Sequence, residues 1–234
     1  INTALNVQNS KTINRRGRNA DFFLFSRNFV GSKATGYVPT SAMETAMPTL
    51  DLATAMAASG AAASSNMGSA SIKPLTATLA LLNIRLGLWL RNPRKVTGAA
   101  IWNRAANFYF LLEMFGWLSE RLKSVYVTDG GHVENLGIYE LVRRRCHIVV
   151  AVDAGCDPDY QFEDLANAIR KCWKDFGTRI DIDLAALRPQ GRTKRCQSHF
   201  AVGCIHYPNA PQPGVLIYIK ATLSGRESSD VKEY

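Results

Sequence analysis

Cysteine is scarce in this sequence, and its spacing argues against a cysteine-based framework. Five cysteines occur among 234 residues, and no two of them form a Cys-x-x-Cys pair. Disulfide-stapled domains are much denser in cysteine, so we expect a reduced chain with small packed thiols. The alternative is a metal site from Cys196, His199, Cys204 and His206, but this spacing matches no zinc knuckle. Strand-like alternation would also place His199 on the opposite face from Cys204 and His206. We therefore expect no metal and no other cofactor.

The sequence also lacks an uninterrupted apolar run long enough to cross a membrane. Its most apolar stretch, residues 75–90, is broken by Asn83, Arg85 and Gly87, whereas a spanning helix needs about 20 apolar residues. We interpret 75–90 as a buried core helix, with an amphipathic helix at a bilayer surface as the alternative. A second helix is predicted over 105–122, which makes 75–122 a helical insertion that could face a membrane.

Neither disorder nor a collagen-like chain fits the composition, which is 47% hydrophobic and 20% charged. The 28 Lys and Arg residues exceed the 19 Asp and Glu residues, which gives a formal charge of +9. Such a surface favours nucleic acid or acidic phospholipid headgroups. No helix-turn-helix, RNP or zinc signature is present, so we expect an anionic membrane surface and no nucleic acid.

No signal peptide is visible at the start of the chain, which begins with Ile1. We interpret the sequence as a segment internal to a longer protein. The expected location is cytoplasmic or peripherally membrane-associated.

A run of small residues over 50–68 predicts a helix that Gly60 interrupts near its end. Small side chains let backbones approach closely. The run therefore suits a helix packed beneath a sheet or beside a ligand pocket.

An α/β fold is indicated by the second half of the chain. A strand over 124–128, a helix over 136–145 and an apolar strand over 147–153 predict a βαβ unit in a parallel sheet covered on both faces. An amphipathic helix over 162–176 and a strand over 180–184 are predicted to follow. Strands over 199–207 and 215–222, joined by a proline-rich loop, predict a C-terminal β-hairpin.

Asp129 is the leading candidate for chemistry. It ends a predicted strand and precedes a helix, where open α/β sheets place their ligands. Gly130 and Gly131 let another group approach its carboxylate closely, and Asn135 could cap the helix or brace the loop. The alternative is a simple turn, because Asp-Gly is a common turn dipeptide.

The pattern Asp129-Gly-Gly-x-x-x-Asn135-x-Gly137 resembles the Asp-Gly-Gly segment of patatin-like and cytosolic phospholipase A2-like lipid acyl hydrolases. The run over 127–146 is similar to large bacterial patatin-like phospholipases, and the run over 57–68 resembles a second block of that family. The resemblance implies a patatin-like sheet with flanking helices, incomplete here, plus the C-terminal hairpin. Residues 1–234 would then be the carboxyl-side portion of one catalytic domain.

The resemblance also implies a Ser–Asp dyad that hydrolyses phospholipid or lysophospholipid esters without a metal. Asp129 would be the general base toward the serine, and the site loop would consist of Gly130, Gly131, His132 and Asn135. His132 could line the pocket or form a hydrogen bond within the loop.

Two elements of the family pattern are missing from this sequence. There is no G-x-S-x-G serine and no glycine-rich oxyanion loop. Ser59-Gly60 comes nearest, but the family places that block after its nucleophile. The chain would therefore supply the Asp without the serine and should not hydrolyse lipid unaided. The alternative function is a non-catalytic, basic, membrane-associating module.

A calcium site is the alternative for the acidic segment that follows the strand predicted at 147–153. Asp157, Asp159, Glu163 and Asp164 lack the calcium-loop spacing and lie at a predicted helix start, where acids are stabilised. Asp153 could reach the rim of the same sheet, although capping its loop is the simpler interpretation.

Overall fold

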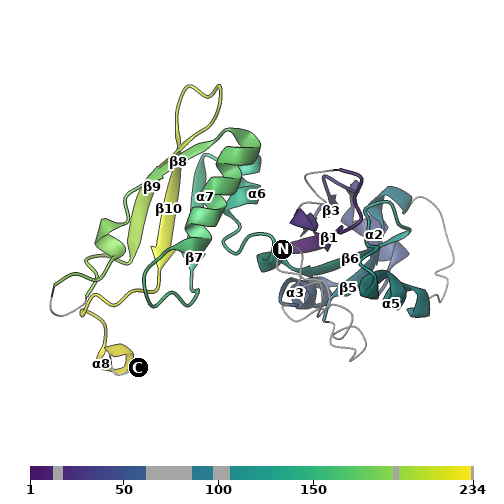
Figure 1. Cartoon of the computed structure of the whole chain (residues 1–234), viewed down its shortest axis with the longest axis horizontal. Helices are drawn as coiled ribbons and strands as arrows, with labels where there is room; N and C mark the ends of the chain where they lie inside the picture. The colour runs from purple at the N-terminus through teal and green to yellow at the C-terminus, as the bar shows by residue number, and fades with distance from the viewer. Residues whose placement is uncertain (13–17, 62–85, 97–105, 192–194, 233–234) are drawn as a thin grey trace. The chain divides into compact units, whose positions relative to one another are not determined.

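A computed structural model gives the fold, and it describes residues 1–12, 18–61, 86–96, 106–191 and 195–232. The chain divides into two compact units, Ile1–Asn135 and Leu136–Tyr234. Each unit has its own sheet (Figure 1).

The first unit is built on a six-stranded sheet of order β4-β3-β2-β1-β6-β5. All neighbouring pairs in it are antiparallel. Its strands are β1 (Asn2–Asn6), β2 (Ala20–Phe25), β3 (Phe29–Ser32), β4 (Gly36–Pro39), β5 (Leu88–Arg91) and β6 (Ser124–Asp129). Its helices are α2 (Thr40–Ala46), α3 (Leu52–Ser59) and α5 (Ala106–Met114), with short 3-10 turns η2 (Pro93–Lys95) and η3 (Gly130–His132).

The small residues of α3 allow this helix to pack directly on the sheet. Ala55 and Ala58 are buried in the same apolar core as Leu5 of β1 and Val127 of β6. Asp51 caps the helix by accepting a hydrogen bond from Thr54 N at 2.7 Å. The predicted helix beneath a sheet is confirmed for Leu52–Ser59, while 62–68 lie outside the described residues.

The second unit is a four-stranded mixed sheet of order β7-β10-β9-β8. Its strands are β7 (Ile148–Asp153), β8 (Arg179–Ile182), β9 (Phe200–His206) and β10 (Gly214–Lys220). Its helices are α6 (Ile138–Arg143), α7 (Glu163–Phe176) and α8 (Ser229–Lys232), with the 3-10 turn η4 (Ala185–Leu187). β7 runs parallel to β10, and β9 is antiparallel to both β10 and β8.

The α/β class is therefore confirmed, and so is the C-terminal hairpin, formed by β9 and β10. The helix expected over 162–176 is α7, which Gly177 ends with a left-handed φ of 63°. Whether the two units form one catalytic domain, with 75–122 as an insertion, stays a prediction.

The predicted βαβ unit is wrong. β6 belongs to the first sheet, where β1 and β5 flank it, and β7 belongs to the second, beside β10. The helix α6 therefore connects two sheets and does not cross over within one. Both strands are apolar enough to pair in either sheet, so their sequence could not specify their partners.

The prediction that β7 is covered on both faces is also wrong. Its residues alternate between exposed and buried, and Ile148, Val150 and Val152 are 63%, 53% and 67% exposed. The helices α6 and α7 pack on the other face, on which Leu216 and Tyr218 of β10 are buried.

The helix predicted over 75–90 is wrong for Leu88–Leu90, which belong to β5 (Leu88–Arg91), and residues 75–85 lie outside the described part. Pairing with β6 buries Leu90 and stacks the Trp89 ring on Tyr109 at 4.4 Å. These non-local contacts outweigh the local helical propensity. The helix expected over 105–122 ends at Met114, shortly before Gly116, whose φ is 64°.

Candidate functional site

Asp129 stands at the carboxyl end of β6, where the strand passes into η3. Its backbone is paired with Thr3 of β1, and its side chain is partly buried. The carboxylate Oδ1 accepts a hydrogen bond from Gly131 N at 2.8 Å. Within the described residues no cation forms an ion pair with it. The carboxylate is thus oriented by the backbone of its own turn and not by a salt bridge.

Two glycines after Asp129 allow this turn to press against its neighbours. A Cβ on Gly130 would lie 2.7 Å from the carbonyl oxygen of Asn2, and one on Gly131 would lie 2.3 Å from Asn135 Oδ1. Both distances are too short for an ordinary contact. Gly130 is therefore needed to bring the Asp129 turn against the backbone of β1, and Gly131 leaves room for the Asn135 side chain.

His132 is held within the same loop. Its Nδ1 lies 3.0 Å from the Thr128 hydroxyl, which also accepts a hydrogen bond from Asn6 Nδ2 at 2.9 Å. Thr128 and Asn6 are fully buried. Because neighbouring residues of a strand point to opposite faces, this contact directs His132 toward the Thr128 side of β6. His132 thus braces the loop, one of its two expected roles.

The end of α3 lies at the same edge of the sheet, which sequence reasoning did not foresee. Ser59 Oγ donates to the carbonyl oxygen of Asn2 at 2.8 Å, and Asp129 N donates to the carbonyl oxygen of Ala61 at 3.4 Å. The Ser59 hydroxyl therefore lies near the Asp129 turn, and it donates its hydrogen bond to the backbone and not to the Asp129 carboxylate. The run of small residues over 50–68 is the feature of the sequence that could have indicated this close contact.

An open, largely apolar cavity of about 430 Å³ lies beside the other end of α3. It is lined by Ile1, Phe25, Ser26, Arg27, Val30, Thr40, Glu44, Leu50, Asp51, Leu52 and Ala55. Asp129 is not among its lining residues. Ala55 and Ser59 are one helical turn apart, about 6 Å along the axis. The cavity and the Asp129 turn are therefore neighbours along α3.

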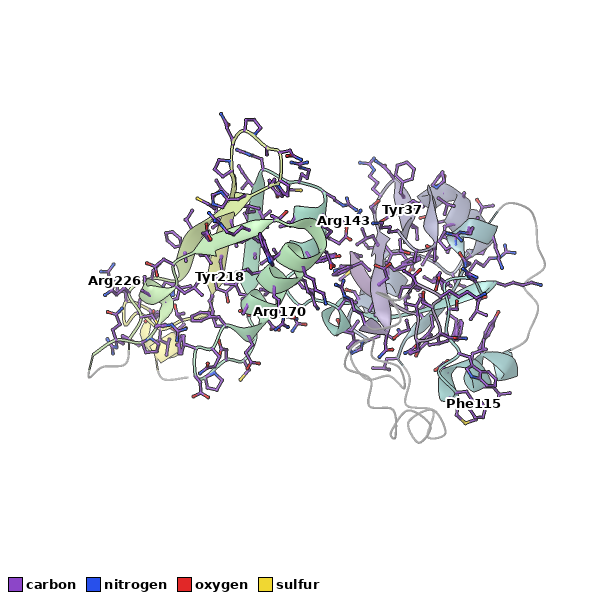
Figure 2. All side chains as sticks on the ribbon, turned by 45° about the horizontal axis from the view of Figure 1, so that its top comes forward. Tyr37, Phe115, Arg143, Arg170, Tyr218 and Arg226 are labelled. Atoms are coloured by element: carbon purple, nitrogen blue, oxygen red, sulfur yellow. The ribbon has the colours of Figure 1, made fainter. Side chains whose placement is uncertain are left out.

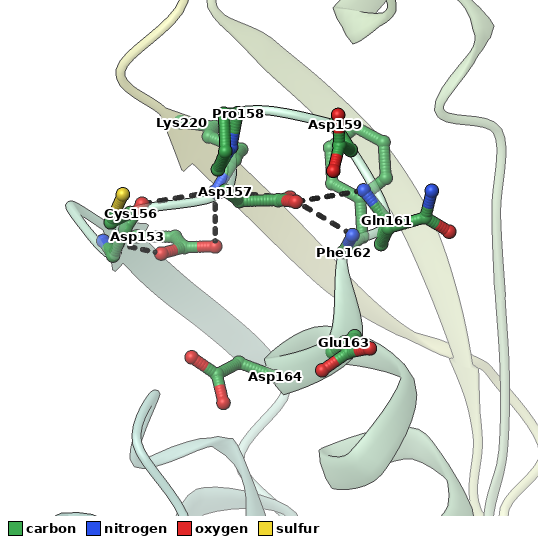
Figure 3. A pocket seen from close by; sticks show the side chains of 11 residues that line it. Asp153, Cys156, Asp157, Pro158, Asp159, Gln161, Phe162, Glu163, Asp164 and Lys220 are labelled. Carbon is green, nitrogen blue, oxygen red and sulfur yellow. Dashed lines mark hydrogen bonds and ion pairs between the residues drawn. The ribbon is translucent and has the colours of Figure 1, made fainter.

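A second, polar cavity of about 250 Å³ lies in the other unit, at the carboxyl ends of β7 and β10 (Figure 3). Its centre is an ion pair between Lys220 Nζ and Asp153 Oδ2 at 3.0 Å, and both side chains are only 4% exposed. The hydroxyl of Tyr218, which is labelled in Figure 2, donates to the same oxygen. Asp153 also caps its loop by accepting from Gly155 N at 2.8 Å.

These contacts set the protonation of the cluster. Burial acts to raise the pKa of Asp153, but the hydrogen bonds from Tyr218, Lys220 and Gly155 outweigh it and hold the pKa below its usual value. Burial and the adjacent carboxylate raise the pKa of Tyr218. Asp153 is therefore an anion and Tyr218 a neutral donor over the ordinary pH range.

The calcium alternative gains no support from the geometry. Asp157 accepts from Gln161 N and Phe162 N at 2.8 and 2.9 Å, and it lies 3.6 Å from Lys220. A backbone turn and a buried cation thus occupy its oxygens. No group of three His, Cys, Asp or Glu that could hold a metal ion is found in the part of the chain that the structure describes.

Comparison with protein-family models, with curated proteins and with solved structures finds no match for this chain. None of the helices among the described residues has the length and apolar character to cross a bilayer.

Proposed function

We propose that this chain supplies the general base of a Ser–Asp dyad in a patatin-like hydrolase of phospholipid or lysophospholipid esters. The observation that carries the proposal is the placement of Asp129. Its carboxylate stands at the end of a buried strand, oriented by Gly131 N and without an ion pair to any described residue. The resemblance of 127–146 to that family supplies the reaction.

In this reaction Asp129 accepts the proton of a serine hydroxyl as the serine oxygen attacks the ester carbonyl. Asp129 then returns the proton to the departing alcohol, which leaves an acyl-serine. Water attacks the acyl-serine in the same way and releases the fatty acid. Gly130 contributes by letting the turn pack against the start of β1, and Gly131 leaves room for the Asn135 side chain beside the carboxylate.

The apolar cavity beside α3 supports a substrate with an acyl chain. Its volume of about 430 Å³ lies in the usual range of small-molecule sites, roughly 300–1,000 Å³. Apolar side chains such as Phe25, Val30 and Leu50 line it, and Arg27 stands among its polar residues. The proposal assigns the acyl chain to this cavity.

The proposal places the serine outside these 234 residues, since they contain no G-x-S-x-G. The test therefore uses the natural full-length protein with vesicles of phosphatidylcholine and lysophosphatidylcholine as substrates. Asp129→Asn is expected to lower ester hydrolysis by at least about a thousandfold and to leave vesicle binding unchanged. Asp159→Asn, at an exposed position, is the matched control and should keep full activity.

Retention of activity by Asp129→Asn would show that the dyad assignment is wrong. Ser59→Ala separates the two possible sources of the hydroxyl. It should leave hydrolysis within a fewfold of the parent, and its loss of activity would place the nucleophile in this chain.

The second candidate, a non-catalytic membrane-binding module, is favoured by the distribution of charge. Residues 1–135 contain 14 Lys and Arg but 7 Asp and Glu, a net charge of +7 out of the total of +9. Binding to anionic vesicles that weakens with salt, without hydrolysis in the full-length protein, would select this function.

A further inference from the structure

Among the described residues, the uncovered face of the second sheet is an apolar surface that the proposed function does not use. β7, β10 and β9 present nine side chains on this face, in three cross-strand rows that follow from the strand register. From β7 through β10 to β9, the cross-strand rows are Ile148–Val215–Cys204, Val150–Ile217–Val202 and Val152–Ile219–Phe200. We call these nine residues the apolar face. None of them is charged, and seven are β-branched.

The apolar face is accessible. Five of its side chains are 53–67% exposed: Ile148, Val150, Val152, Phe200 and Val202. Cys204 is exposed, and the three residues of the central strand β10 are partly buried. A contiguous apolar surface of this kind marks an interaction site on a soluble protein.

We infer that the apolar face is the self-association surface of this chain, on which a second copy stacks face to face about a two-fold axis. Sheets pack in this way with their strands roughly aligned and about 10 Å apart. An axis parallel to the strands would place β10 over its own copy and β7 over the partner's β9. Val150 would then lie opposite Val202 of the partner subunit, so the face is complementary to itself.

The area fits a dimer. A Val, Ile or Phe side chain loses roughly 100 Å² of apolar surface on full burial, and about half of this remains exposed here, so nine side chains supply on the order of 400 Å². A standard interface takes about 800 Å² from each partner, of which about 65% is apolar in homodimers. The apolar face thus supplies most of the apolar part of one such interface.

The charges around the face favour a second copy over a membrane. Along one side, Asp181 Oδ2 is paired with Arg179 Nε at 3.0 Å and with His206 Nε2 at 3.1 Å, which makes a polar rim without a large excess of either sign. Residues 136–234 carry 14 Lys and Arg against 12 Asp and Glu, a net charge of only +2. Anionic bilayers attract strongly basic surfaces, and the basic surplus lies in the other unit.

The experiment measures the mass of the full chain in solution by light scattering after size exclusion, at micromolar concentration. The parent is expected to have twice the monomer mass of 25.8 kDa. Val150→Lys/Val202→Lys should raise the dissociation constant more than about a hundredfold, because stacking would bury two unpaired charges per copy. Both positions are exposed in the monomer, so circular dichroism should be unchanged. Leu223→Lys, at a 49% exposed position outside the face, should remain dimeric.

Two exposed cysteines give an independent readout. A bulky maleimide should modify Cys204 slowly in the parent dimer and at least about tenfold faster in the double Lys variant, as expected for a buried interface position. Cys156, in the loop after β7, should react at the same rate in both proteins. A monomeric parent, a dimer unaffected by the double substitution, or vesicle binding that the double substitution abolishes would each overturn the inference.

Discussion

Gly130 shows how a single hydrogen atom in place of a side chain positions the candidate site. The residue has an ordinary φ, so it is not required for backbone conformation. It is required because the turn packs against β1, where a Cβ would meet the backbone oxygen of Asn2 at 2.7 Å. Asn2 belongs to β1, which is paired with β2 and β6, so its backbone oxygen cannot move aside cheaply.

Gly130→Ala should therefore destabilise the first unit by about 2–3 kcal/mol, since the added methyl group overpacks a rigid contact. The matched control is Gly60→Ala at the end of α3, where the nearest atom would be 3.8 Å from the new Cβ. That change should be neutral or stabilising by up to about 1 kcal/mol. Urea unfolding of both variants measures the two free energies, and equal effects would contradict the packing argument.

At the scale of elements, the Asp153–Lys220 pair joins the parallel strands β7 and β10 at their carboxyl ends. The apolar core beneath it includes Val149 and Leu216 on the same face of the sheet. Removing the Asp153 carboxylate would leave the buried Lys220 with only its longer contact to Asp157, at 3.6 Å. The pair therefore fixes how these two strands end and how the loop over 154–162 begins.

Asp153→Asn should lower the free energy of unfolding by about 3 kcal/mol at neutral pH. Because folding lowers the pKa of Asp153, the unfolded chain binds its proton more readily. The stabilisation is full above the unfolded pKa of about 4 and is lost as the pH falls toward the lower folded value.

Chemical denaturation of parent and variant at a series of pH values measures this dependence. The stability difference between them should be constant from about pH 7 to pH 5 and should shrink below about pH 4. Asp159→Asn, an exposed carboxylate of the same loop, should follow the parent throughout. A difference that did not change with pH would contradict the assignment.

At the scale of the whole molecule, the two units have separate cores and separate sheets. The core that contains Leu5, Phe23 and Val127 lies wholly within residues 1–135, and Leu165 and Leu216 are buried side chains of the unit 136–234. Each unit has the size of a small domain that unfolds cooperatively by itself.

Calorimetry of the full chain should therefore show two transitions. Gly130→Ala should lower the temperature of one of them, and Asp153→Asn should lower that of the other. Each shift should be several degrees, as expected for a change of 2–3 kcal/mol in a domain of 100–150 residues. A single transition that moves with both substitutions would show that the units unfold together.

The sequence predicted well where the signal is local. The polar and apolar periodicity of α7 with Gly177 at its end, the strand alternation of β9 and β10, and the strand that ends at Asp129 all appear as expected. In each case the pattern depends on residues close together in the chain, whose spacing follows from helix or strand geometry.

The sequence could not predict which strands pair, because pairing depends on contacts between residues that are far apart in the chain. The apolar runs of β6 and β7 suit a central position in either sheet, and only the tertiary structure assigns them to different ones. The contacts around Asp129 were hidden for the same reason, since Asn2 and Ala61 are more than sixty residues away in the chain.

The sequence by itself thus determined α7, the strands β9 and β10, the glycine turn after Asp129 and the excess of basic residues, because each follows from residue type and short-range spacing. The tertiary structure decided which strands pair, that Asp153 is buried against Lys220, and that one face of the second sheet is bare. These outcomes depend on non-local packing between apolar surfaces. Many arrangements of strands and helices are compatible with the same local patterns, and packing selects one of them.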